Sequence, residues 1–544
     1  MAHPWKSMRE WLADEEKLGQ VIRISAPIKA GDPDSIVDAV PPEVAEENLR
    51  VINVTGASGK MMESELRAVS RYLHSLPGRP IGVIENPVNN CPDVPVVINP
   101  WADRERVLRM CGVSSKEELC KKLLTLKHKS IPPIVVSRES APVKEVVIRE
   151  DEIDVKKQLP HNWVEFENMP WSPCGGGQFF VYDPETQTHD IGIWRGGFFQ
   201  WQNGQPDTPF SEEMQKRHMV VAMIYEGPIA TDGGAYFREK FRRLKKPMPA
   251  AYAMCCDPGI VATAAVRTGL VWPQDGVCEI AVAGGFNGQA IEVVESETIP
   301  GLMVPAHAEY VVEGEFLPED YIVPKYSEGV YQGHLTGEHS MPMFRIKSIT
   351  HRRKPMWMTT WSSSGLNHAG PHSDFADTLF EAEALNYLQG NGFKVKDIVS
   401  YDLETIVIQT TVDGAQKPPH YGKTLLQALY SCPHGYLGNG NKFYICVGPD
   451  INPYDLRDVI WALGTRVQPA TDTILIRDGL CAWGDPSGIP GPLGWRAYGQ
   501  QVLIDALIKV PERRTDWDPR TEPRNWEEAA IERIKRKLES YARD

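Results

Sequence analysis

The stretch HDIGIWRGG, residues 189–197, places one carboxylate and one guanidinium on a short apolar segment that ends in glycines. Its side chains alternate between two faces with the period of two that is typical of a β-strand. Asp190 and Arg195 lie five positions apart, so they face opposite ways on a flat strand, and a bulge near the glycines would bring them to one site. An ordinary strand with a surface ion pair is the alternative that this stretch leaves open.

The composition is that of a globular protein built from several units. With 544 residues, of which 42% are hydrophobic and 24% charged, the chain is long enough for about three or four of them. A net charge of −14 argues against a nucleic-acid binder, which would normally be basic. The N-terminus lacks the apolar core of a signal peptide, and no run approaches the ~20 apolar residues of a spanning helix. We therefore predict a cytoplasmic protein that binds neither nucleic acid nor a membrane.

The hydrophobic pattern divides the chain into four parts. Residues 1–130 indicate an α/β unit, beginning with an amphipathic helix over 7–18 and a strand from 21. Residues 131–335 contain short strands punctuated by glycine, which is typical of a β-barrel, with a basic helical insertion at 238–247. Residues 336–511 return to an α/β pattern with a helix over 373–389. The fold class predicted from this order is α+β, with several domains.

The fourth part, residues 512–544, is a polar tail that ends in an amphipathic helix. A charged helix with one apolar stripe docks either on its own core or on another subunit, and the sequence leaves both open. The stripe consists of Trp526, Ala530, Ile534, Leu538 and Tyr541.

Two carboxylates stand in apolar surroundings. Glu279 lies in CEIAVAGG, residues 278–285, which we expect to form a strand that is apolar on both sides. A carboxylate buried there needs a basic partner or a metal ion, and Asp190 poses the same question. Two oxygen ligands from separate strands suit Mg²⁺ or Mn²⁺, while structural ion pairing remains the alternative. The ten cysteines form no CxxC pair and predict reduced, mostly buried thiols.

Several segments together resemble the UbiD family of decarboxylases, which use prenylated FMN. DIGIWR (190–195) is similar to the family's Asn-x-Gly-Ile-x-Arg strand, and CEIAVAGGFNG (278–288) to its Ser-Glu-Tyr-x-x-x-Gly segment. VPAHAEYVVEGEF (304–316) resembles the Val-Pro-Ala-x-(Ala/Ser)-Glu-Ile-Val-Leu-Glu-Gly signature. DVIWALGTRVQPATDTILI (458–476) and the opening SMREWLADEEKLGQVIRI (7–24) are also similar to family segments. The resemblance runs in order from about residue 7 to 480.

The resemblance implies a three-part fold with bound cofactors. The central domain would be a split β-barrel like that of flavin reductases, and the C-terminal α/β domain would serve oligomerisation. Prenylated FMN would be the cofactor, supplied by a prenyl-FMN synthase, with Mn²⁺, or another divalent metal, and K⁺ bridging its phosphate. The protein would be a homo-oligomer, between a dimer and a hexamer.

The resemblance also assigns site residues. Glu279 matches the family's metal-binding glutamate, and Asp190 stands where the family usually has a metal-binding asparagine. Arg195 matches the arginine that holds the substrate carboxylate and contacts the flavin. Ile193 and Trp194 would provide backbone contacts to the cofactor.

Two departures from the family pattern concern the metal site and the proton donor. Where the family has a metal-binding histidine ahead of Gly-Gly, this chain has Thr231 and Asp232 before Gly233, so one of these two takes that role or metal binding differs. Glu328 retains the acid that pairs with the arginine. The family's proton-donating carboxylate falls on a glycine at 333, followed by His334, which is either the donor or an exposed loop histidine.

The activity implied is the reversible decarboxylation of an aromatic or α,β-unsaturated carboxylic acid. A sharper variant is an aryl-CoA substrate, as in the phthaloyl-CoA decarboxylase branch, with the basic segments 238–246 and 351–354 receiving the CoA phosphates. The alternative is a non-catalytic flavin-binding subunit of a carboxylase complex, suggested by the changes at Thr231 and at position 333.

Overall fold

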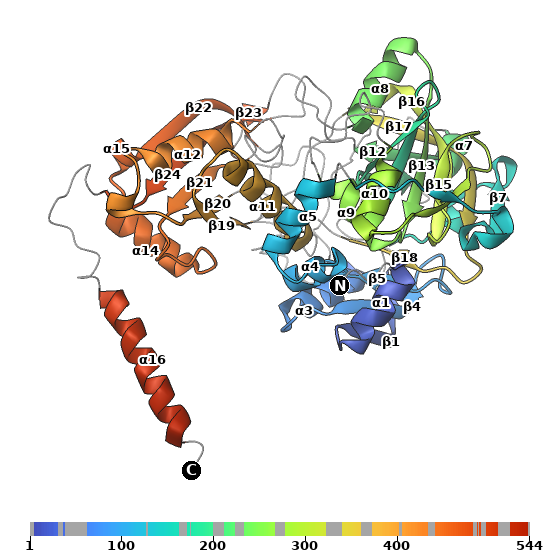
Figure 1. Ribbon diagram of the computed structural model, residues 1–544. Coiled ribbons are helices and arrows are strands. Elements are labelled where there is room, and N and C mark those ends of the chain that lie inside the picture. Colours follow the sequence, from blue (N-terminus) through green and yellow to red (C-terminus); the bar gives the residue numbers. More distant parts are fainter. Residues whose placement is uncertain are drawn as a thin grey trace.

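A computed structural model gives the architecture of the chain (Figure 1). The described residues are 5–30, 36–37, 63–126, 129–162, 171–174, 176–199, 211–222, 233–266, 278–322, 340–360, 373–401, 405–432, 441–481, 487, 489–490, 497–509 and 523–541.

The N-terminal unit is a small sheet covered by helices. The order of its strands is β1-β4-β5-β18, in which β1 pairs with β4 in parallel. Ser7 caps α1 by accepting a hydrogen bond from the backbone N–H of Glu10, and Trp11 is fully buried, which confirms the predicted first helix. The elements are α1 (Met8–Lys17), β1 (Val21–Lys29), α3 (Glu65–Ser75), β4 (Ile81–Val88), β5 (Val96–Ile98), α4 (Arg104–Met110), α5 (Lys116–Leu126) and β18 (Trp357–Met358), with β2 (Ile36–Val37) paired to β3 (Glu63–Ser64).

The central unit is a large antiparallel sheet. Its order is β10-β9-β13-β16-β17-β12-β11-β8, with β7 paired to β17. The strands are β7 (Val146–Arg149), β8 (Trp171–Cys174), β9 (Gln178–Asp183), β10 (Thr188–Gly192), β11 (Arg195–Phe199), β12 (His218–Ala222), β13 (Met248–Met254), β16 (Tyr310–Ile322) and β17 (Ser340–His351). A smaller sheet consists of β15 (Met303–Pro305), β14 (Glu292–Glu295) and β6 (Ile134–Val135).

The large sheet must curl, because consecutive strands lie near its opposite ends. Six inter-strand spacings separate β10 from β11 along the sheet. If the sheet were flat, the distance between these two strands would be about 29 Å. Only Ile193 and Trp194 join the two strands, and such a short link spans no more than about 11 Å. The sheet therefore closes into a partial barrel, and the predicted mixed α/β fold with a barrel-like centre is confirmed.

Residues 278–285 form a helix and not the strand that we expected. They belong to α10 (Glu279–Asn287), which Cys278 precedes and Gly288 ends in the left-handed region at φ 75°. The segment is buried on most sides, so its sequence is apolar throughout and carries no period that distinguishes helix from strand. A Cβ at Gly285 would lie 2.1 Å from the backbone oxygen of Lys129, so only glycine permits this close packing.

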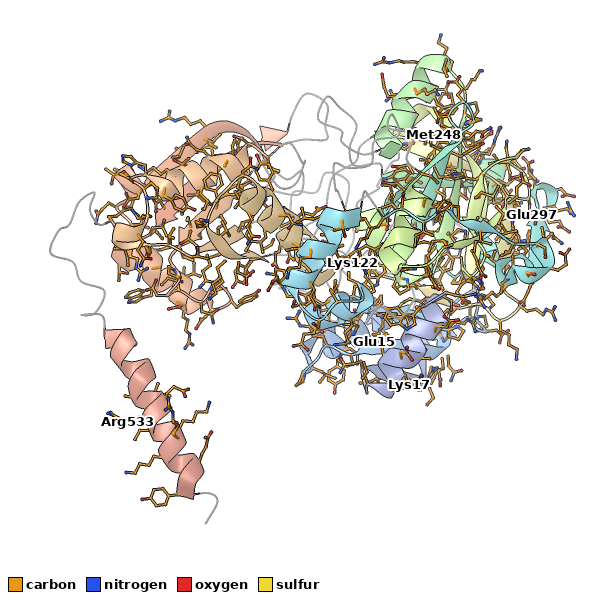
Figure 2. All side chains as sticks on the ribbon, in the orientation of Figure 1. Glu15, Lys17, Lys122, Met248, Glu297 and Arg533 are labelled. Atoms are coloured by element: carbon orange, nitrogen blue, oxygen red, sulfur yellow. The ribbon has the colours of Figure 1, made fainter. Side chains whose placement is uncertain are left out.

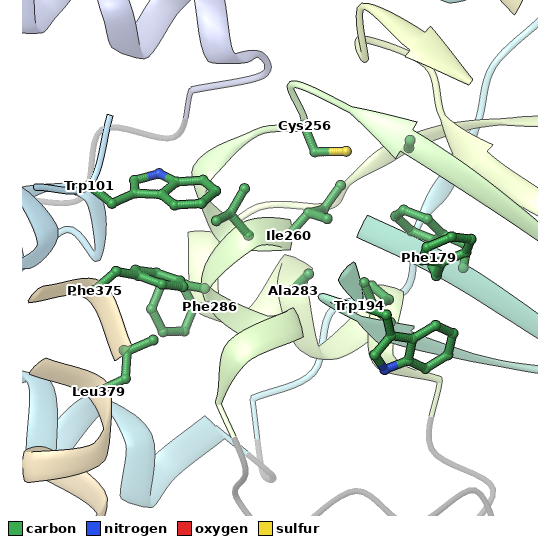
Figure 3. Packing of buried hydrophobic residues seen from close by; sticks show 14 of the residues in the cluster. Trp101, Phe179, Trp194, Cys256, Ile260, Ala283, Phe286, Phe375 and Leu379 are labelled. Atoms are coloured by element: carbon green, nitrogen blue, oxygen red, sulfur yellow. The ribbon is translucent and has the colours of Figure 1, made fainter. Parts of the chain in front are cut away.

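Helices cover the central sheet and continue its core into the neighbouring units. In Figure 3 the apolar cluster runs from Phe179 and Trp194 through Ile260 to Phe286 and Phe375. The helices are α6 (Val155–Gln158), α7 (Glu212–Arg217), α8 (Gly233–Leu244), α9 (Pro258–Ala265) and α10; 3₁₀ turns span Arg138–Ser140, Pro142–Lys144 and Glu150–Glu152. α8 confirms the predicted basic helix.

The C-terminal unit is a mixed sheet, in the order β19-β20-β21-β24-β22, flanked by helices. Its elements are α11 (Ser373–Gly390), β19 (Val395–Tyr401), β20 (Thr405–Thr410), a 3₁₀ turn (Gly414–Gln416), α12 (Tyr421–Tyr430), β21 (Phe443–Val447), α14 (Leu456–Arg466), α15 (Pro469–Asp472), β22 (Thr473–Cys481), β23 (Ile489–Pro490) and β24 (Ala497–Ala506). Charged pairs attach α11 to the N-terminal unit: Arg104 binds the buried Glu381, and Lys116 lies 2.8 Å from the same carboxylate.

The terminal helix α16 (Pro523–Tyr541) extends away from the rest of the molecule. Figure 2 shows its side chains, Arg533 among them, standing clear of the other drawn side chains. Four apolar residues of α16 are more than half exposed: Ile531, Ile534, Leu538 and Tyr541. Among the described residues, no helix is long and apolar enough to cross a membrane.

The cysteines are reduced where the structure describes their side chains. Eight of them are free thiols, of which six are buried and two are half-buried. This confirms the prediction that they serve mainly as small apolar residues.

A buried histidine makes the stability of the fold depend on pH. The Nε2–H of His161 donates to the backbone oxygen of Val155 at 3.0 Å, and Nδ1 has no hydrogen-bond partner among the described residues. Burial therefore lowers the pKa of His161 to about 4. Because the unfolded pKa is about 6.5, the contribution of this residue is complete above pH 6.5 and is lost as the pH falls towards 4, by up to about 3 kcal/mol.

We expect His161→Gln to reduce the acid sensitivity of the protein, because glutamine keeps an N–H donor and cannot be protonated. The measurement is the melting temperature of both proteins at pH 7.5, 6.0 and 4.5. The melting temperature of the variant should fall less than that of the wild type as the pH is lowered from 7.5 to 4.5. Equal losses would exclude His161 as a source of the pH dependence.

Candidate active site

The two residues that connect β10 to β11 form the centre of the site. Trp194 is buried and stacks on Phe179, with the ring centroids 5.3 Å apart, while Ile193 is half-buried. A Cβ on Gly192 would come within 2.6 Å of Cε2 of Trp194, so the indole requires a glycine at this position. The predicted single strand over 189–197 is therefore two strands, broken where the tryptophan turns into the barrel core.

Glu279 attaches α10 to the outer edge of the sheet. Its Oε2 accepts a hydrogen bond of 2.5 Å from the backbone N–H of Ile191, in the end strand β10. The carboxylate also lies in the first turn of α10, where the helix dipole favours a negative charge. Glu279 is thus held against the residue that follows Asp190.

Asp190 occupies the middle of β10, where its Cα pairs with that of Val181 in β9. Its side chain is 4% exposed. Asp190 and Glu279 therefore stand on adjoining elements, β10 and α10, and Glu279 comes from a helix and not from the strand that we expected. Carboxylate oxygens are the ligands that Mg²⁺ and Mn²⁺ prefer, so this part of the donor set fits a divalent cation in its chemistry.

His189 is a residue of this region that sequence reasoning did not assign to the site. Its Nε2 accepts a hydrogen bond of 2.9 Å from the backbone N–H of Met303, and its Nδ1 lies 3.9 Å from Sγ of Cys278. Burial lowers the pKa of His189 to about 4, so the ring is neutral near pH 7. The only signal in the sequence was its place at the head of the stretch 189–197.

Other predicted site residues lie partly or wholly outside the described residues. Arg195 is the first residue of β11, and its Cα pairs with that of Ala222 in β12; its side chain is not described. Gly233 is the first residue of α8, which packs against β10. The residues Thr231, Asp232, Glu328 and His334 lie outside the described ranges. Within those ranges, no group of three His, Cys, Asp or Glu side chains could hold a metal ion.

The two basic segments differ in what they can bind. Arg352 donates hydrogen bonds to the backbone oxygens of His307 and Ala308, so it is engaged in holding the chain and is not available to a phosphate. Arg353 and Lys354 of the same segment are exposed, and at the end of α8 four cationic side chains are exposed: Arg242, Arg243, Lys245 and Lys246. If this chain binds a phosphate-bearing substrate through these segments, α8 is the better candidate.

Comparison with known proteins gives consistent matches along the chain. Residues 134–364 match the family model UbiD, described as the 3-octaprenyl-4-hydroxybenzoate carboxy-lyase Rift-related domain, and residues 375–506 match UbiD_C, the C-terminal domain of the same carboxy-lyase. A phenolic acid decarboxylase from Sedimentibacter hydroxybenzoicus is 25% identical over 559 residues, covering 98% of this chain and 99% of the relative. A phenolic acid decarboxylase from Bacillus subtilis is 29% identical over 279 residues, which is 49% of this chain and 53% of that one.

Solved structures match the same fold. The vanillic acid decarboxylase of Sedimentibacter hydroxybenzoicus in its closed form gives a TM-score of 0.70 at 22% identity, covering 98% of this chain and all of that one (100%). An evolved dimeric form of the UbiD-class enzyme HmfF from Pelotomaculum thermopropionicum, in complex with prenylated FMN, gives 0.68 at 22% identity, with 94% and 97% covered.

Proposed function

Because the chain belongs to the UbiD family of carboxy-lyases, and is thus an enzyme, we propose that it is a prenylated-FMN-dependent decarboxylase of an aromatic carboxylic acid. A phenolic acid is the first candidate substrate, since both relatives named above are phenolic acid decarboxylases. The reaction is reversible in principle, so the enzyme would also catalyse carboxylation. The observation that carries the proposal is the hydrogen bond between Glu279 and Ile191, which sets a second carboxylate against β10 beside Asp190.

The residues at the strand break divide the binding tasks. Asp190 and Glu279 would hold a divalent cation, Mn²⁺ in first place, with Thr231 as a third ligand and K⁺ as a second cation. The backbone of Ile193 and Trp194, together with Thr231, Asp232 and Gly233 before α8, would contact the cofactor. Prenylated FMN, when bound, supplies an electron sink for the negative charge left by the departing CO₂.

Three side chains would handle the substrate. Arg195 would grip the substrate carboxylate with its two-pronged guanidinium group. Glu328 would hold Arg195 in place, and His334 would protonate the carbon from which CO₂ has left, because an imidazole titrates near neutral pH. The family motifs assign these roles to Arg195 and Glu328, whereas His334 stands one residue beyond the position of the family's proton-donating carboxylate, which is a glycine in this chain.

An aryl-CoA thioester such as phthaloyl-CoA is the finer variant, which the exposed cations at the end of α8, together with the exposed Arg353 and Lys354, support. The alternative of a non-catalytic flavin-binding subunit is carried by the changes at Thr231 and at position 333. We also propose a homo-oligomer in which the exposed stripe of α16 contacts a second copy of the chain.

The test is turnover by protein co-produced with a prenyl-FMN synthase. We expect flavin absorbance in the purified protein and CO₂ release from one or more phenolic acids. Arg195→Ala should lower kcat/KM by about 10²- to 10³-fold, since it removes the main charged contact to the substrate. Arg23→Ala, which removes a half-exposed arginine paired with Glu16, serves as the control and should turn over normally.

Each contrary outcome rejects a specific part of the proposal. Protein without flavin absorbance would reject the cofactor. Flavin-loaded protein that releases no CO₂ from free acids or thioesters would favour the non-catalytic subunit, and exclusive turnover of thioesters would establish the CoA variant. Wild-type turnover by Arg195→Ala would reject the assigned site.

A further inference from the structure

The contact between β10 and α10 contains a histidine–cysteine pair beside the proposed ligands. We propose that His189 and Cys278 are positioning residues, which hold the first turn of α10 against β10 and so fix where the carboxyl group of Glu279 lies relative to Asp190. The identity of what the two carboxylates bind rests on the proposed function, whereas the pair itself is a feature of the fold.

The imidazole of His189 is fixed in both orientation and tautomer. Because Nε2 accepts a hydrogen bond from the N–H of Met303 at 2.9 Å, a neutral ring carries its proton on Nδ1. Nδ1 lies 3.9 Å from Sγ of Cys278, so its N–H donates to the sulfur. The ring is 6% exposed and packs on Tyr182 with the centroids 4.8 Å apart. Rotation of the ring would break both hydrogen bonds.

Cys278 occupies the N-cap position of α10 without acting as a side-chain cap. An N-cap side chain usually accepts a hydrogen bond from the second or third N–H of its own helix. The Cys278 side chain makes no such bond, and its sulfur lies against His189 instead. The start of α10 is therefore anchored to the neighbouring strand.

A second bond attaches the next residue of the helix to the same strand. Glu279 follows Cys278 and accepts the hydrogen bond from the N–H of Ile191, two residues beyond His189. The two attachments thus flank Asp190 along β10. If the first is lost, the Glu279 carboxylate is retained against β10 only by the bond that it makes itself, and the first turn of α10 can then shift relative to Asp190.

Loss of the His189–Cys278 contact should weaken metal binding, because residues that hold a metal ligand in position contribute to the affinity for the metal. Loss of such a contact typically lowers metal affinity 10- to 100-fold. His189 touches neither substrate nor cofactor in this scheme, so its effect should appear in affinity and in the mobility of the site.

The experiment compares His189→Gln and Cys278→Ala with the control His161→Gln at pH 7.5. His161 is a matched control because it is buried as His189 is and contacts an aromatic ring, Phe198, with the centroids 6.4 Å apart, while its hydrogen bond goes to Val155 and not to β10 or α10. Hydrogen exchange of peptides covering 188–192 is measured in cofactor-free protein, and the affinity for FMN with Mn²⁺ is measured by flavin fluorescence. Both pair variants should exchange the Ile191 amide at least about 10-fold faster and bind about 10- to 100-fold more weakly, while the control matches the wild type.

The outcomes separate this inference from the proposed function. Unchanged exchange in the pair variants overturns the inference, and so does faster exchange with wild-type affinity, because the pair would then be structural only. If wild-type protein binds neither FMN nor Mn²⁺, the proposed function fails, and the exchange data still decide whether the pair holds α10. Cys278 is half-buried, so Cys278→Ala keeps the test open should His189→Gln fail to fold.

Discussion

Glu279→Gln is expected to fold as the wild type does and to lose nearly all decarboxylase activity. Glu279 accepts a hydrogen bond from the backbone N–H of Ile191, and the glutamine carbonyl can accept the same bond. The N–H of Ile191 therefore keeps its hydrogen-bond partner in the variant. What disappears is the negative charge that would bind a divalent cation. We expect kcat/KM to fall by at least about 10²- to 10³-fold, with a change in melting temperature of less than about 2 °C.

Glu279→Ala separates the two roles of this side chain. It removes the charge and also leaves the N–H of Ile191 without its acceptor, which costs about 1–3 kcal/mol if no water replaces it. We therefore expect the alanine variant to be inactive and less stable, and the glutamine variant to be inactive only. Calorimetric titration with Mn²⁺ supplies a readout that does not depend on turnover. Wild-type activity and Mn²⁺ affinity in Glu279→Gln would exclude Glu279 as a ligand.

Amphipathic elements could be predicted from the sequence because their apolar residues carry a period. The first helix shows this, since Met8, Trp11 and Leu12 recur at helical spacing and are all buried in the structure. The helix α10 shows the opposite case. It is packed against α9, α5 and β10, so its sequence is apolar throughout and indicates burial without indicating the element.

The break in the stretch 189–197 could not be predicted, because it depends on distant partners. The alternation of side chains continues across Gly192 and Ile193 with no local signal for a stop. The two strands separate because β10 pairs with β9 and β11 pairs with β8 and β12, at opposite ends of a curled sheet. Local periodicity contains no information about which strands close a barrel.

The site was predicted in part. Asp190 and Glu279 were paired as oxygen ligands from their apolar surroundings and from the family resemblance, and the structure adds the hydrogen bond from Ile191 that attaches Glu279 to β10. The role of His189 could not be found, because its partners Met303 and Cys278 lie about 90 to 115 residues further along the chain and their spacing follows no local rule.

Lys144→Met is expected to produce the largest loss of stability of any single substitution considered. Lys144 and Glu313 form an ion pair at 2.7 Å in which both side chains are completely buried. The second oxygen of Glu313 accepts hydrogen bonds from the hydroxyl of Ser296 at 2.6 Å and the N–H of Glu297 at 2.7 Å, so the carboxylate cannot move to find another cation. Removing one partner of a buried pair typically costs about 3–5 kcal/mol.

The measurement is the midpoint of urea-induced unfolding, with Lys121→Met as the matched control. Lys121 pairs with Glu117 at 2.6 Å on an exposed face of α5, where both side chains are at least 70% exposed and the solvent screens the pair. The double variant Lys144→Met/Glu313→Gln should be more stable than Lys144→Met alone, because it removes the buried charge that the single substitution leaves without a counter-ion. The single variant Glu313→Gln completes the comparison. If the loss of stability in the double variant equals the sum of the losses in Lys144→Met and Glu313→Gln, the ion pair does not account for the effect of Lys144→Met, and the cavity left by the lysine side chain does.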